Sequence, residues 1–372
     1  ILTVGFNTIM MKSRPRHIKI ESDKKLFHEL KNLVYKKIES LPKSRLYPLK
    51  IKLFFYPLIY FGLYVFALYQ ADKIGLFFLS YSLMGFMVVI IFCELIHELS
   101  HNNVFNKSHH NRIALKLFDL LGANSYIWQK RHVKLHHHFP NVNGWDADIE
   151  QKGPVAIFPN EENKNSTKFQ HRYVFFLYPL FMLNWLFIRD FRDFFSKKRI
   201  IRKVIEIPRV EYLKLFFFKI FYIFIILVIP VAFAGVSILQ VIGGLLFLTI
   251  SGSVLAMIVL LTPHINVSNE FPKIDVNGKI NTSWFRHQLI TTNDIDNSNW
   301  LIRNFMGNFN FHVAHHLFPN ISSVYAPEIT QLLKSFCEKH SLPYKSYPIS
   351  TSFKKHYQLI RKNAFAVHEM NL

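Results

Sequence analysis

Cysteines and acidic residues are both scarce in this sequence of 372 residues. The two cysteines, Cys93 and Cys337, are too few for a disulfide framework or a cysteine-rich zinc site, which fits a protein in a reducing compartment. Asp and Glu number 24 against 45 Lys and Arg, so the formal net charge is +21. These basic residues flank apolar runs and form no stripe interleaved with aromatic residues, which disfavours nucleic acid as a partner. The first residues place an apolar stretch before positive charge, the reverse of a signal peptide.

Long apolar runs, in contrast, are abundant. Half of the residues are hydrophobic and 38 are phenylalanine. A helix needs roughly 20 apolar residues to cross a bilayer. Four runs are long enough, at about 50–70, 75–96, 213–234 and 237–262. The sequence therefore predicts an all-α integral membrane protein with four transmembrane helices.

Basic residues are distributed unevenly around these runs. The connections ADKIG and AFAGVS, which follow the first and third runs, carry one lysine between them. The opposite side carries the basic N-terminus and six basic residues between Lys197 and Arg209. Because short cytoplasmic loops are enriched in Lys and Arg, both termini and both long polar regions are predicted to be cytoplasmic.

The charge and hydropathy patterns divide the chain into three regions. Residues 1–48 are predicted to be a cytoplasmic N-terminal region with one helix around 22–41. Residues 49–345 form the membrane domain, and residues 346–372 a cytoplasmic C-terminal tail.

Two segments of the membrane domain are amphipathic or too short to assign as spans. Residues 113–128 and 173–188 are predicted to be interfacial helices, the second because it contains Pro179 and Asn184 between polar flanks. A crossing at 173–188 would move the last histidine cluster to the other side of the membrane from the first two, and a shared metal site argues against that.

Three histidine clusters lie in the predicted cytoplasmic regions. They read HELSH, HVKLHH and HVAHH, with spacings of three to five residues that gather rings on one face of a helix. In the middle cluster His132 and His136 share a face, whereas His137 points about 100° away and is predicted to reach a second metal. Eight imidazoles exceed the four ligands of one zinc, so the clusters predict two metals in a helical cap. The eight residues are His97, His101, His132, His136, His137, His312, His315 and His316.

Two other metal sites compete for parts of this pattern. HELSH matches the zinc-protease signature H-E-x-x-H, in which Glu98 would be the general base, but a protease leaves the other two clusters unexplained. Soluble di-iron proteins use Glu-x-x-His pairs, and Glu94 with His97 is one such pair without a second. We therefore expect a site made mainly of imidazoles, with Glu94 orienting a histidine ring.

Four stretches of the chain resemble the integral-membrane fatty-acid desaturases, with the resemblance covering roughly residues 50–345. They are RHVKLHHHFPNVNGWDADIE (131–150), FQHRYVFFLYPLFMLNWLFIRDF (169–191), WFRHQLITTNDID (284–296) and NFNFHVAHHLFPNISSVYAPEI (308–329).

The resemblance implies that the eight cluster histidines, and one more after the fourth span, hold two iron ions. The ninth ligand falls on His264, with His287 as the competitor, whereas His109, His110 and His138 are not expected to bind metal. Hydrogen-bond partners that fix the rings are expected among further residues near the clusters. These are Asp146, Asp148, Gln288 and Asn293, and also His287 in case it does not bind metal itself.

The resemblance also implies an O2-dependent oxidoreductase that introduces a double bond into a long acyl chain bound to a lipid, CoA or a carrier protein. Two features depart from the family's front-end members. His312 stands where many of them have Gln, and no HPGG haem motif of a fused cytochrome b5 domain occurs. Electrons are therefore expected from a separate donor, ferredoxin or cytochrome b5. A lipid hydroxylase and a non-catalytic metal binder remain alternatives.

Overall fold

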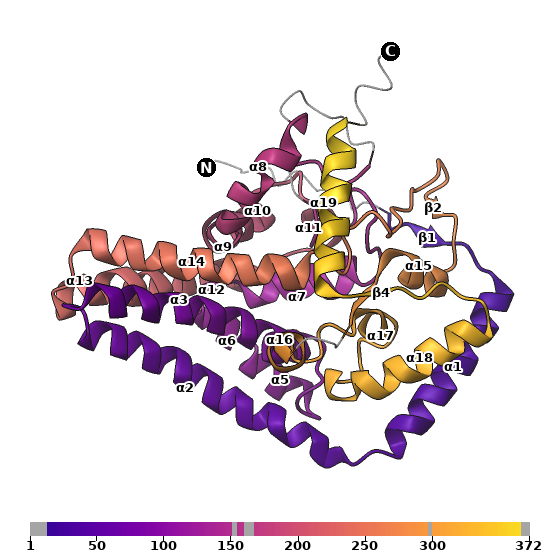
Figure 1. Cartoon of the computed structure of the whole chain (residues 1–372), viewed down its shortest axis with the longest axis horizontal. Helices are drawn as coiled ribbons and strands as arrows, with labels where there is room; N and C mark the ends of the chain where they lie inside the picture. The colour runs from indigo at the N-terminus through magenta and orange to yellow at the C-terminus, as the bar shows by residue number, and fades with distance from the viewer. Residues whose placement is uncertain (1–12, 151–154, 160–166, 297–299, 366–372) are drawn as a thin grey trace, which may run out of the picture.

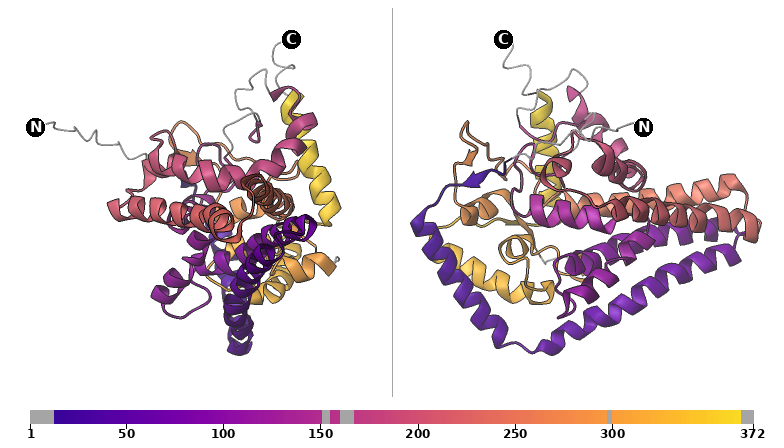
Figure 2. Two further views of the ribbon diagram at one scale, coloured as in Figure 1. Left: turned by 90° about the vertical axis from the view of Figure 1, so that its left-hand side faces the viewer. Right: turned by 180° about the vertical axis from the view of Figure 1, so that it is seen from behind.

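The computed structural model describes residues 13–150, 155–159, 167–296 and 300–365, so the N-terminal apolar stretch on which the signal-peptide prediction rests lies outside it. Helices dominate these ranges, and the strands among them are four segments of two residues each. Long apolar helices form a bundle on one side of the molecule, and the other helices, with the loops between them, form a cap on the other (Figure 1). Figure 2 shows the same division from behind.

The four predicted spans are all helical. They are α2 (Tyr47–Tyr69), α3 (Ile74–Ile91), α12 with α13 (Arg209–Ile223 and Ile229–Ala234), and α14 (Ile238–Leu260). Their outer faces expose large apolar side chains such as Phe54, Phe217 and Leu239, which suits contact with lipid. A fifth described helical segment, Gln170–Val204, is also long and apolar enough to cross a membrane, and it contains the predicted interfacial helix 173–188.

Small residues let α3 and α14 approach closely at the centre of the bundle. A Cβ atom on Gly85 would lie 2.1 Å from the carbonyl oxygen of Leu248, and one on Gly252 would lie 2.8 Å from the carbonyl oxygen of Gly85. The Ser251 hydroxyl donates to the Ser82 carbonyl at 2.8 Å across the same contact. Glycine and serine thus replace apolar side chains where two backbones meet inside a membrane bundle.

The cap contains the predicted N-terminal helix, which the structure places at α1 (Glu21–Glu39). Leu30 and Val34 of α1 pack with Leu333 of α18 (Ala326–Lys339) in a separate apolar core. α15 (Trp284–Thr291) contacts α1, and α17 (His312–Leu317) contacts both α15 and α18. Ile302 of α16 (Trp300–Phe305) packs instead in the main apolar core.

Two short parallel strand pairs tie distant segments of the cap together. β1 (Arg16–His17) pairs with β2 (Lys279–Ile280), and β3 (Asp294–Ile295) pairs with β4 (Ser346–Tyr347). Each pair joins a terminal region of the chain to the loops that follow α14.

The single helix predicted at 113–128 is wrong. The chain instead forms α5 (Ser108–Ala114), α6 (Leu117–Leu120) and α7 (Ser125–Arg131). Gly122, at φ +91°, breaks the chain between α6 and α7, and the side chain of Asn124 then caps α7 by accepting from the backbone N–H of Ile127. Most apolar residues of this stretch pack in the main core, from several sides of a turn, so one helical face does not describe them.

The predicted C-terminal tail is folded over residues 346–365. Its helix α19 (Ile349–Phe365) packs against α8 (Gln170–Leu177). The Gln170 side chain donates to the Ile360 carbonyl at 2.8 Å, and Asn363 donates to the Ile157 carbonyl at 2.6 Å. The tail is therefore part of the cap in this range.

After α8 the chain continues through α9 (Phe181–Asn184) and α10 (Asp190–Phe195) to α11 (Ile200–Val204). Its middle part contacts α14, where the backbone N–H of Met182 donates to the Ser253 hydroxyl at 2.9 Å. In Figure 1 these short helices lie across α14 and do not run beside it as α3 does.

Candidate metal centre

The three histidine clusters meet where the bundle joins the cap, and they form two groups of buried imidazoles. Within each group the ligand atoms all lie within 4.8 Å of one another. Two ligands on opposite sides of one metal would be roughly 4.2 Å apart with bonds near 2.1 Å. We call His97, His101, His132, His137 and His315 the first group, and His136, His264, His312 and His316 the second group.

The middle cluster contributes to both groups, as the spacing predicts, but the assignment within it is wrong. His132 and His137 belong to the first group, and His136 belongs to the second. Residues His132–His136 form a π-helical turn, in which the backbone N–H of His137 donates to the carbonyl of His132 at 3.1 Å. A π turn aligns residues five apart instead of four, so His137 lies over His132. A second π turn, Phe92–Ile96, immediately precedes His97.

The ring nitrogens crowd together in pairs. The Nε2 atoms of His137 and His132 are 3.0 Å apart, and those of His315 and His137 are also 3.0 Å apart. The Nε2 atoms of His264 and His312 are 2.8 Å apart. Ring pairs thus bring nitrogen lone pairs together within each group.

Several ring nitrogens in the described part of the chain are buried without a hydrogen-bond partner. They include Nε2 of His97, His101 and His316. Buried polar atoms in proteins are normally satisfied, so a cluster of unsatisfied imidazole nitrogens fits metal ligation.

The electrostatics of the site keep most of these rings neutral. Burial first, and then neighbouring histidines, lower the pKa of His264, His312 and His315 well below the usual range. Burial likewise disfavours the charged form of His136, but the adjacent Asp146 carboxylate raises the pKa of that ring. Neutral imidazole is the form that binds a metal.

Three of the predicted hydrogen-bond partners hold rings of the site. Asp148 Oδ2 lies 2.7 Å from His132 Nδ1, and Asp146 Oδ1 lies 2.9 Å from His136 Nδ1. Gln288 Oε1 accepts from His316 Nδ1 at 3.0 Å. Each contact places the proton on Nδ1 and leaves Nε2 facing the group, which is how ligand tautomers are set in metal proteins.

Burial alone would raise the pKa of Asp148. The hydrogen bond from His132 and the charge of Arg131 instead hold that pKa well below the usual range. The carboxylate is therefore ionised and can accept the imidazole proton.

Two predicted partners do not reach a histidine ring among the described residues. Glu94 accepts from Lys52 and Tyr56 of α2, so the prediction that it orients a histidine is wrong. Lys52 is close enough to pair with this carboxylate, and the pair holds α2 to α3. Asn293 accepts from the side chains of Asn266 and Asn269, and so supports the loop after α14 instead of a ring.

His287, the competitor for the ninth position, lies outside both groups. Its Nε2 donates to the Pro140 carbonyl at 2.8 Å, and its Nδ1 lies 3.0 Å from His17 Nε2. The structure thus brings His264, and not His287, beside His312. His138 is exposed, and its Nδ1 lies 3.1 Å from the Val133 carbonyl oxygen.

The glutamate of HELSH is turned away from the rings. Glu98 is buried and accepts from the Ser322 hydroxyl at 2.6 Å and from the Ser323 backbone N–H at 3.1 Å. A zinc protease needs this glutamate beside the metal-bound water. Glu98 instead joins the end of the second predicted span to the loop before α18.

Sequence reasoning missed a buried ion network behind His132. Arg131 donates from Nε to Asp148 at 2.7 Å and from Nη1 to Asp193, and Arg199 donates to Asp193 at 2.7 Å. The ring of Trp128 stacks on His132 with centroids 4.9 Å apart. The available signal was the charged pair Asp190 and Asp193 directly after an apolar segment.

Comparison with known proteins agrees with this site. The sequence profile of the fatty acid desaturase family matches residues 74–348. The chain belongs to the fatty acid desaturase family. It is therefore an oxidoreductase of the desaturase type, as predicted.

Three relatives of this desaturase are named as lipid or acyl-lipid desaturases. The sn-1 linoleoyl-lipid 6-desaturase of Synechocystis sp. is 30% identical over 254 residues, which cover 68% of this chain and 70% of that protein. The protein of the same name from Arthrospira platensis is 28% identical over 282 residues, or 76% of each chain. The acyl-lipid (8-3)-desaturase of Physcomitrium patens is 28% identical over 315 residues, which cover 82% of this chain and 64% of that protein.

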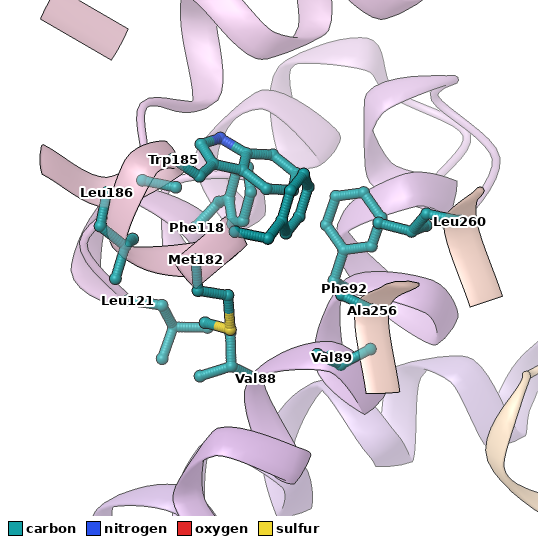
Figure 3. Close-up of a pocket in the computed structure, with 12 residues that line it drawn as sticks. Val88, Val89, Phe92, Phe118, Leu121, Met182, Trp185, Leu186, Ala256 and Leu260 are labelled. Carbon is teal, nitrogen blue, oxygen red and sulfur yellow. The ribbon is translucent and has the colours of Figure 1, made fainter. Parts of the chain in front are cut away.

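Two adjoining cavities of this desaturase lead from the histidines into the bundle. The first is lined by His97, His132, His264 and other groups of the site. The second is lined by apolar side chains that point toward one another in Figure 3. The two cavities share four lining residues, Phe92, Phe181, Trp185 and Leu260.

The second cavity extends away from the rings. Val88 lies nine residues before His97 on the helical segment Ile74–Ser100, a separation of roughly 13 Å along the axis. Ala256 lies one turn before Leu260 on α14. The pair of cavities is thus polar at the histidine end and apolar at the bundle end.

Proposed function

We propose that this protein is an oxygen-dependent acyl-lipid desaturase with two iron ions. The single observation that carries the proposal is the pair of adjacent groups of buried histidines at the end of an apolar cavity. The relatives named above act on acyl lipids according to their names, which favours a lipid-bound acyl chain over CoA or a carrier protein as the substrate.

The first group would hold one iron through His97, His101, His132, His137 and His315. The second group would hold the other iron through His136, His264, His312 and His316. When bound, the irons supply the activation of dioxygen that removal of hydrogen from an unactivated methylene requires.

The residues of this chain would position the substrate. The acyl chain lies in the apolar cavity with its methyl end toward Val88 and Ala256, and the bond to be desaturated lies beside the histidines. Phe92 and Trp185, which line both cavities, keep water from the reacting carbons. Burial of each methylene contributes about 0.8 kcal/mol to binding.

Balance of the reaction requires a partner protein. Two hydrogens leave adjacent methylenes, and together with two further electrons and two protons they reduce dioxygen to two waters. We propose a separate donor, ferredoxin or cytochrome b5, that delivers these electrons from the cytoplasm.

We also propose four membrane spans with both termini, the cap and the histidines on the cytoplasmic side. Residues on both sides of the apolar stretch 173–188 of the fifth segment contact the cap side. Gln170 donates to the Ile360 carbonyl of α19, and Arg189 donates to the Asp148 carbonyl at 2.9 Å beside the site. Only its middle, at Met182, reaches α14. A segment that begins and ends in the cap enters the membrane and returns, so it does not count as a span.

Expression in a host with simple lipids tests the proposal. With a working electron donor, fatty-acid methyl esters analysed by mass spectrometry are expected to contain a new unsaturated species, and the purified protein is expected to contain two irons per chain. A hydroxylated product would favour the lipid hydroxylase. Neither product from iron-loaded, well-expressed protein would contradict the proposal.

Filling the apolar end of the cavity is expected to shorten the preferred substrate. Ala256→Phe adds a ring where Ala256, 3% exposed, lines the cavity one turn from Leu260. The relative conversion of the longest acyl chains should then fall at least tenfold. Their last methylenes no longer fit, which weakens transition-state binding by about 1–3 kcal/mol. Competition between acyl chains of different length measures the change.

Val254→Phe is the matched control, because Val254 lies on the same helix but is 46% exposed on its outer face. An unchanged length preference in Ala256→Phe, or an equal shift in both variants, would contradict the assignment of the cavity.

A further inference from the structure

Residues Tyr344–Tyr347, between α18 and α19, cross the cap beside the second group of histidines. We call them the C-terminal strap. Its last two residues form β4, which pairs with β3 in parallel. The backbone N–H of Asp294 donates to the Lys345 carbonyl at 2.9 Å, and that of Asp296 donates to the Tyr347 carbonyl at 2.9 Å.

The strap reaches His312 and His316 through Asp294. The buried Asp294 carboxylate accepts from the backbone N–H of Val313 at 2.7 Å, at the first turn of α17. The Tyr344 hydroxyl donates to the other oxygen of the same carboxylate. The N-cap residue of α17, Phe311, makes no capping hydrogen bond with its side chain. The Asp294 carboxylate accepts from the first turn of the helix in its place.

The strap reaches His264 through Lys345. The ammonium group of Lys345 donates to the Ser268 carbonyl at 3.0 Å, to Asn269 Oδ1 at 2.9 Å and to the Ile290 carbonyl at 2.6 Å. The Asn269 amide in turn donates to the Pro263 carbonyl at 2.8 Å and to the His264 carbonyl at 3.1 Å. The lysine thus fixes the amide that holds the backbone of His264.

The first group is held by other parts of the chain. His97 and His101 follow α3, and His132 and His137 belong to the π turn after α7. Only His315 of that group lies on α17. Three of the four histidines of the second group, in contrast, depend on the two connections just described.

We propose that Tyr344 and Lys345 are positioning residues for the second metal, which they place by clamping α17 and the loop after α14 to each other. This inference rests on the proposed two-iron function and assigns the strap a role at one of the two irons. Removing partners that orient metal ligands typically lowers metal affinity about 10–100-fold.

The test is the metal content of Lys345→Met and Tyr344→Phe in the full-length protein, loaded with ferrous iron and then dialysed. Both variants are expected to fall from two irons per chain toward one. The ferric protein should gain the EPR signal of an isolated half-integer-spin ion, which a coupled pair lacks. Lys345→Arg, which keeps the charge and the donors, should recover part of the second iron.

Lys339→Met is the matched control, since that lysine on α18 is 67% exposed and pairs only with Glu29 at the surface. Its metal content should equal that of the unchanged protein. If Lys345→Met does not fold, Tyr344→Phe decides the question, because it removes a single oxygen.

Parallel loss of both irons, or retention of both in the two variants, would overturn the inference. The iron content of the unchanged protein distinguishes failure of this inference from failure of the proposed function. Fewer than two irons in the unchanged protein overturns the two-iron proposal and the strap's role with it.

Discussion

Replacing His316 by alanine is expected to abolish formation of the unsaturated product. His316 belongs to the second group, its ring is fully buried, and Gln288 fixes its tautomer at 3.0 Å. Its Nε2 has no hydrogen-bond partner in the described structure, so that atom is free to bind a metal. Loss of one of four ligands should also lower the iron content from two toward one per chain, measured by elemental analysis alongside fatty-acid methyl esters.

His138→Ala is the matched control for this variant. His138 directly follows His137 in the sequence, but its side chain is exposed and belongs to neither group, and its Nδ1 lies 3.1 Å from the Val133 carbonyl oxygen. It should retain full activity and both irons. A His316→Ala protein that still desaturates would contradict the assignment of the second group. It would also favour the alternative metal site that uses the HELSH cluster alone.

Replacing Arg131 by methionine is expected to lower the free energy of unfolding by about 3–5 kcal/mol, the usual consequence of breaking a buried ion pair by removing one partner. Arg131 is 1% exposed and lies between Asp148 and Asp193. Its loss leaves the buried Asp193 and the partly buried Asp148 without their shared cation, with Arg199 still paired to Asp193. Denaturant unfolding in detergent, followed by tryptophan fluorescence, measures the change.

The same variant should weaken iron binding in the first group, because Asp148 orients His132 at 2.7 Å. Arg112→Met, at an exposed position of α5, is the control and should change stability by less than about 0.5 kcal/mol. The double variant with Asp193→Asn should lose less than the sum of the two single changes, since both residues belong to one network. Full additivity, or an Arg131→Met protein as stable as the control, would contradict this account of the network.

Much of the bundle could be predicted from the sequence. A run of about twenty apolar residues has few alternatives to a membrane helix, because a backbone in lipid must satisfy its own hydrogen bonds. The four predicted runs are accordingly helical. The segment 113–128 fails for the opposite reason: its apolar residues pack on several sides of a chain that turns at Gly122, so no single helical face describes them.

The spacing of the histidines predicts which of them bind metal. It does not predict which histidines share one metal or which residues form hydrogen bonds with their rings. Helical periodicity predicts that the middle histidine cluster serves two metals. A π turn, which no residue spacing announces, decides that His136 is the member that joins the second group. Glu94 looked like a partner of His97 three residues away, yet Lys52 from a different helix pairs with it.

The sequence by itself determined the membrane-helix segments, the excess of imidazole ligands and the family, because each depends on local composition or on a short run of residues. Only the tertiary structure decided how nine histidines divide between two groups, which carboxylates hold them, and that Tyr344 and Lys345 lie beside the second group. These contacts join residues up to about 180 positions apart, as in His315 with His137, and their pairing follows from packing between elements that no local pattern encodes.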